Sequence, residues 1–60
     1  MDAARLAAFA ANELEMARED TAAEAAWVLA CDLGARVAFE EREEWVRRHQ
    51  RCAARILSRG

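Results

Sequence analysis

The sequence predicts an all-α protein, a helical hairpin that assembles with further copies into an oligomeric helical bundle or an antiparallel coiled coil. Sixteen of the 60 residues are alanine and none is proline; alanine favours helices and proline ends them. The larger apolar side chains recur every three or four positions, as in amphipathic helices. A chain this short buries only about 60% of its unfolded surface. We therefore expect one small domain over residues 1–60 whose core is completed by a partner chain.

The first helix is expected over residues 3–18. Its larger side chains fall on one helical stripe, which we expect to face the core. The stripe consists of Leu6, Phe9, Ala10, Glu13, Met16 and Ala17. Glu13, in its middle, is either paired with an arginine at the border of the stripe or buried as a base or metal ligand.

The second helix is expected over residues 22–57, after a turn at residues 18–20. Thr21 and Glu24 have the spacing of a capping box, in which each side chain hydrogen-bonds a free amide of the first helical turn. A helix of this length would extend for about 54 Å. Gly34 is its one glycine, and glycine is favoured just past a helix end. A break there would instead give three helices.

An oligomer seam is predicted along one side of this long helix. The seam residues are Trp27, Cys31, Ala38, Trp45, His49, Cys52 and Ile56. The shorter first helix cannot cover all of them, so their spacing favours a coiled coil with another chain. An antiparallel two-fold dimer centred between Glu41 and Arg42 would pair opposite charges. It would also allow a crosslink from Cys31 of one chain to Cys52 of the other.

The charge distribution suggests an anionic partner as the alternative. All 11 acidic residues precede residue 45, whereas residues 45–60 contain five arginines and no acid. Candidate contacts to nucleic acid or to an anionic surface are Arg47, Arg48, Arg51 and Arg55. A solvated outer helix face explains the same pattern. The outline of a dimerising helical hairpin of this length resembles that of small RNA-binding proteins that control plasmid copy number, as a likeness of fold alone.

A metal or redox site is a further alternative. His49 and Cys52 are three residues apart on one helical face, and Cys31 could complete the ligand set. Packing of the three side chains in the seam is the interpretation that we favour, so we predict no metal and no cofactor. One serine, one threonine and no tyrosine leave few groups for catalysis, and we expect no enzyme.

The compartment and function are predicted from what remains. Asp2 stands where a signal peptide would be basic, no apolar run is long enough to span a membrane, and two cysteines are too few for a disulfide framework. We expect a cytoplasmic, non-enzymatic, homo-oligomeric interaction module of accessory or regulatory type. It would bind another protein through an apolar helical face that contains Trp27 or Trp45.

Overall fold

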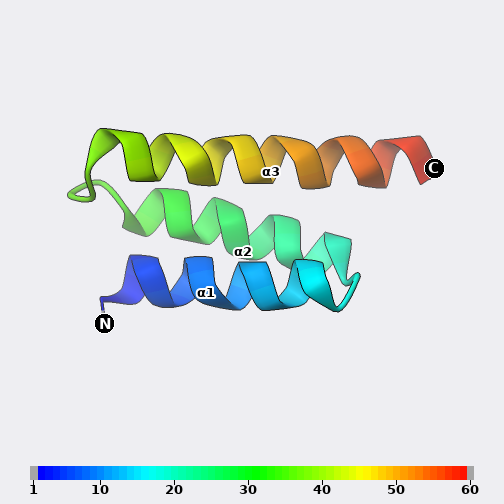
Figure 1. Cartoon of the computed structure of the whole chain (residues 1–60), viewed down its shortest axis with the longest axis horizontal. Helices are drawn as coiled ribbons and strands as arrows, with labels where there is room; N and C mark the ends of the chain where they lie inside the picture. The colour runs from blue at the N-terminus through cyan, green and yellow to red at the C-terminus, as the bar shows by residue number, and fades with distance from the viewer. Residues whose placement is uncertain (1, 60) are drawn as a thin grey trace.

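The fold consists of three helices, each of which runs antiparallel to the one before it in the sequence. The computed structural model describes residues 2–59, with α1 at Ala3–Met16, α2 at Asp20–Leu33 and α3 at Phe39–Arg59. The helices lie side by side with α2 between α1 and α3 and further from the viewer, in a molecule of 34 × 18 × 14 Å (Figure 1). The all-α class is confirmed. None of the helices described combines the length and the apolar character that crossing a membrane requires.

The chain breaks at Gly34, so the three-helix alternative holds and the continuous helix over residues 22–57 is not formed. α2 ends at Leu33, and α3 begins at Phe39. A Cβ at Gly34 would lie 2.8 Å from Cζ3 of Trp45 and 2.9 Å from the carbonyl oxygen of Ala30. Glycine is required because Trp45 packs directly against the chain there, which folds α3 back along α2.

The turn between α1 and α2 is a Schellman motif with arginine in the glycine position. Arg18 has a φ of 62°, and its amide donates to the Glu15 carbonyl at 3.0 Å. The amide of Glu19 donates to the Leu14 carbonyl at 2.9 Å. These two bonds satisfy carbonyls at the end of α1 and reverse the chain.

The predicted capping box at the start of α2 is not formed. α2 begins at Asp20, one residue before Thr21, and the residue that caps it is Glu19, which makes no side-chain capping bond. The Asp20 side chain is instead turned toward α3, where it meets two arginines. Asp20 thus forms ion pairs with two arginines of α3, and the capping box between Thr21 and Glu24 is absent.

The core is small and rich in alanine, which corrects the predicted orientation of α1. The buried apolar residues are Ala4, Ala8, Ala11, Ala23, Trp27, Ala30, Trp45 and Cys52. α1 therefore buries its alanines, and the predicted stripe from Leu6 to Ala17 is exposed along its whole length. Short alanine side chains at a helix contact allow the two backbones to approach closely.

Candidate protein-interaction surface

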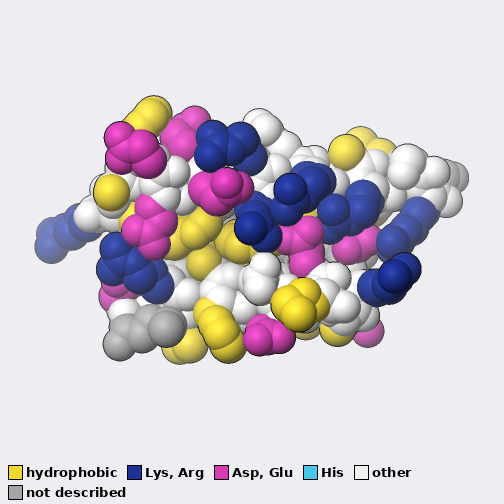
Figure 2. Space-filling view, in the orientation of Figure 1, with side chains coloured by type: hydrophobic (Ala, Val, Ile, Leu, Met, Phe, Trp, Pro, Cys, Tyr) yellow, Lys and Arg dark blue, Asp and Glu magenta, His cyan; other side chains and the backbone are white. Residues whose placement is uncertain are grey.

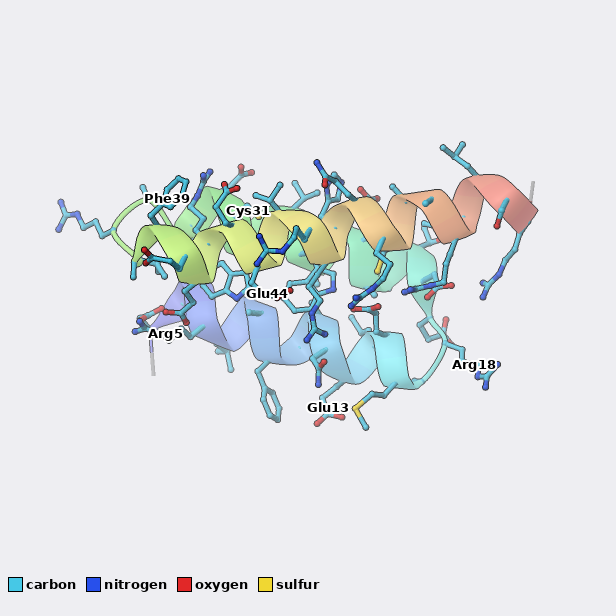
Figure 3. The ribbon with its side chains drawn as sticks, turned by 45° about the horizontal axis from the view of Figure 1, so that its top comes forward. Arg5, Glu13, Arg18, Cys31, Phe39 and Glu44 are labelled. Atoms are coloured by element: carbon cyan, nitrogen blue, oxygen red, sulfur yellow. The ribbon has the colours of Figure 1, made fainter. Side chains whose placement is uncertain are left out.

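Large apolar side chains project from the outer edge of α1. Leu6, Phe9 and Met16 are 57%, 56% and 72% exposed, and we call these three residues the α1 edge. Hydrophobic side chains are visible along the side of the molecule where α1 lies (Figure 2). Glu13 lies on the same edge and points away from the bundle (Figure 3), so it is neither a buried base nor a core ligand.

A second apolar surface lies across α1 and α2, and we call it the hairpin face. One row, on α1, is Ala3, Ala7, Ala10 and Leu14; the other, on α2, is Ala22, Ala26, Leu29 and Leu33. Leu29 and Leu33 are 51% and 48% exposed. Ala3 and Leu33 line the same hollow, which sets the N-terminal end of one row beside the C-terminal end of the other.

The hairpin face has the spacing of a helix-packing seam and contains no charged residue. Steps of four, three and four residues recur in both of its rows. Among residues 2–59, six of the eight large hydrophobic side chains that are exposed lie on α1 and α2. Five of the eight positions of the hairpin face are exposed, whereas Ala7, Leu14 and Ala26 are half-buried against the core. Exposed apolar surface of this kind marks interaction sites in small soluble domains.

The two tryptophans do not belong to an exposed surface. Trp27 and Trp45 are only 3% and 6% exposed, and they lie at the base of a groove between α1 and α3. The Trp27 indole donates from Nε1 to Glu15 at 2.9 Å, and the Arg48 guanidinium lies 5.6 Å from the centroid of its ring. The predicted partner-binding face containing Trp27 or Trp45 is therefore wrong, because both rings fill the core.

Glu15 is the centre of an ionic network between α1 and α3. Its carboxylate lies 2.5 Å from Arg55, 3.9 Å from Arg51 and 4.0 Å from Arg48. Burial by itself would raise the pKa of Glu15, but hydrogen bonds from Arg55 and Trp27 outweigh it and hold that pKa below its usual value. The same carboxylate raises the pKa of Arg55. The network keeps both groups charged.

Asp20 extends the network into α2. It is 4% exposed, and its Oδ1 accepts a hydrogen bond from Arg55 at 3.2 Å. Its Oδ2 lies 2.8 Å from Arg59 as an ion pair without hydrogen-bond geometry. A buried carboxylate is costly unless it is paired, so these arginines stabilise the α1–α2 turn.

The four arginines predicted to contact nucleic acid divide into two pairs. Arg48 and Arg55 turn inward, to Asn12 and Glu15 respectively. Arg47 and Arg51 are more than half exposed. Arginines form a row over α3 toward its C-terminus, with acidic side chains visible among them (Figure 2). The row is thus a partly neutralised surface.

The predicted seam residues pack within one chain. Trp27, Trp45 and Cys52 are buried, Cys31, His49 and Ile56 are half-buried, and Ala38 is exposed. The two residues at the centre of the predicted dimer register, Glu41 and Arg42, make contacts within the single chain. Glu41 accepts two hydrogen bonds from Arg5, each 3.0 Å long, and Arg42 donates to the Cys31 carbonyl at 3.0 Å.

The three candidate metal ligands do not converge. His49 lies 2.6 Å from Glu24 through Nε2, while the Cys52 thiol accepts a hydrogen bond from Arg55. Burial raises the pKa of both Cys31 and Cys52, which disfavours their thiolate forms. Within residues 2–59, no three histidine, cysteine or acidic side chains are placed to hold a metal ion.

Comparison with known protein families, curated proteins and solved structures found no match.

The Glu15 network was missed in the sequence, although a signal for it exists. Arg48, Arg51, Arg55 and Arg59 follow three- and four-residue steps on one side of α3. Glu15 precedes the turn predicted at residues 18–20, and Asp20 is its last residue. A row of arginines opposite two acids at the end of a hairpin indicates ion pairing between helices. From the sequence alone, such a row is not distinguished from an outward-facing charged surface.

Proposed function

We propose that this protein is a non-enzymatic helical interaction module that binds a protein chain through the hairpin face and the adjoining α1 edge. The observation that carries the proposal is the inverted burial in α1, where alanines are inside and Leu6, Phe9 and Met16 are outside. Exposing these side chains to water is unfavourable by about 25 cal/mol for each Å² of apolar surface. Covering them with a partner recovers that free energy.

The polar groups support a binding role rather than a catalytic one. Glu15, Asp20 and Arg55 are held in ion pairs between helices, and His49 is paired with Glu24. These groups stabilise the bundle in its folded form. Free thiols at Cys31 and Cys52 suit a reducing compartment such as the cytoplasm.

The structure favours a protein over a nucleic acid as the partner. Two of the four candidate arginines, Arg48 and Arg55, already hold α1 against α3. Contacting phosphates with them would weaken those bonds. The hairpin face, in contrast, makes no ion pair that a partner would have to replace, because its eight positions carry only alanine and leucine.

Site-specific photo-crosslinking tests the proposal. A photoreactive side chain is placed at position 6 or 29, on the proposed surface, and at position 57 as the control, because Leu57 is also a leucine and is more exposed than either but lies on α3. In cells of the source organism we expect protein adducts from positions 6 and 29 and none from position 57. Adducts from position 57 alone, or adducts to nucleic acid, would contradict the proposal.

A further inference from the structure

We infer that the hairpin face is covered by a second copy of the same chain in a two-fold symmetric dimer. The inference rests on the proposed function and names the partner. Three observations carry it: the pattern of large and small residues on the face, its lack of charge, and the small core of the single chain.

The residues of the hairpin face are complementary to the same face of a second copy. Along α2 the row reads Ala22, Ala26, Leu29, Leu33. When a second α2 lies antiparallel on the first, Leu29 meets the partner's Ala26 and Leu33 meets the partner's Ala22. Leucine against alanine allows the two surfaces to interdigitate without voids.

The α1 row has the same property about the same axis. Its sequence is Ala3, Ala7, Ala10, Leu14, so an antiparallel second α1 sets Leu14 against the partner's Ala3. Because α1 and α2 lie side by side, one two-fold axis serves both rows. The other two-fold arrangement, α1 on the partner's α2, also places each leucine against an alanine. The match is therefore independent of which arrangement forms.

The absence of charge favours a symmetric partner. In a two-fold interface the same patch meets itself, so a charge near the axis would meet its own copy and repel it. The eight positions of the hairpin face contain alanine and leucine only. The nearest acid on α1, Glu13, lies on the outer edge and points away from the bundle (Figure 3).

The single chain also needs further burial. Apart from Trp27 and Trp45, the buried apolar side chains of residues 2–59 are small, namely five alanines and Cys52. Chains of this size are marginal without a supplement such as oligomerisation. A standard interface covers about 800 Å² on each partner, roughly a fifth of the 4151 Å² of this chain, and two adjacent helices offer more of that area than one.

Sedimentation equilibrium under reducing conditions tests the inference with a matched pair of variants. We expect the wild-type chain to dimerise reversibly. Leu29→Glu, on the face, should raise the dimer dissociation constant by at least about 100-fold, because two-fold symmetry introduces the change at two buried sites. Leu57→Glu, the same change on α3, should leave the dissociation constant within about threefold. Circular dichroism of each variant should show unchanged helix content at high concentration.

Two results would overturn the inference. One is a wild-type chain that stays monomeric at about 1 mM; the other is a dimer that Leu57→Glu weakens and Leu29→Glu does not. If the wild type is monomeric but photo-crosslinks at positions 6 and 29 capture a different protein, the second copy is excluded and the proposed function stands. If neither association nor crosslinking depends on the face, both proposals fail.

Discussion

The α1–α2 hairpin and α3 are held in the fold by different forces. Within the hairpin, alanines such as Ala8, Ala11 and Ala23 are buried against the opposite helix. α3 instead inserts a large ring, Trp45, and is tied to α1 by side chains that bridge the gap, such as the Arg5–Glu41 pair. Small buried residues thus permit close backbone packing, whereas α3 is attached through one aromatic anchor and a set of ion pairs.

The difference is repeated on the outer surfaces. Close alanine packing leaves leucine, phenylalanine and methionine of the hairpin exposed, while the exposed residues of α3 are mostly polar or charged, such as Glu40, Arg47 and Arg51. A helix that buries its small residues must place its large ones elsewhere. Here the large residues form an exposed apolar surface against which another helix can pack. We therefore assign partner binding to the α1–α2 hairpin, and to α3 the role of stabilising the bundle.

Of the substitutions considered, Trp45→Ala should lower the free energy of unfolding most, because it removes the aromatic ring through which α3 packs into the core. Removing a buried tryptophan is expected to lower the free energy of unfolding by about 3–5 kcal/mol, and in a chain this short that is enough to release α3. Urea denaturation at fixed protein concentration measures it. Leu57→Ala, at an exposed residue of the same helix, is the control and should change stability by less than about 0.5 kcal/mol. A loss below about 1 kcal/mol in Trp45→Ala would show that the aromatic anchor is unimportant.

Glu15→Gln should weaken the ionic part of the attachment, with an intermediate effect. The amide oxygen of glutamine can still accept the hydrogen bond from Trp27, but the pairing with Arg55 is lost. We expect a loss of about 1–3 kcal/mol at pH 7. Glu13→Gln, at an exposed acid of the same helix, should be nearly neutral.

The pH dependence of stability separates the ionic contribution from packing. The pKa of Glu15 is lower in the folded chain than its ordinary value of 4.5. Its contribution is therefore fully present above about pH 4.5 and is lost as the pH falls through the folded pKa. Wild type should lose more stability between pH 5 and pH 3 than Glu15→Gln. If wild type and Glu15→Gln lose the same stability between pH 5 and pH 3, Glu15 does not contribute to the acid sensitivity of the fold.

Phe9→Ala should have the smallest effect on the single chain and sharpen the contrast with Trp45. More than half of Phe9 is exposed, so we expect the stability of the monomer to change by less than about 0.5 kcal/mol. The comparison with wild type is made by thermal unfolding at low micromolar concentration, where association contributes least. A loss above about 2 kcal/mol would place Phe9 in the core and reverse the assigned orientation of α1.

Much of the secondary structure could be predicted from the sequence, because helix propensity and glycine placement act locally. The first helix was predicted over residues 3–18 and is found at Ala3–Met16, and Gly34 was identified as the one plausible break. For the candidate site, apolar stripes could be predicted from the spacing of the residues, but not which stripe is exposed. Trp27 and Trp45 were expected at a chain–chain contact and are the large side chains of the core.

Local pattern alone determined that this chain forms helices and that Gly34 is the one place where the second helix could be interrupted. Only the tertiary structure decided which side of each helix is inside, because α1 has two apolar sides, one of alanines and one of larger residues, and periodicity does not distinguish them. The structure packs the alanine side of α1 into one core with residues of α2 and α3, including Trp27 and Trp45. The same holds for Glu15 and Arg55, which are 40 residues apart in the sequence and meet because α3 folds back.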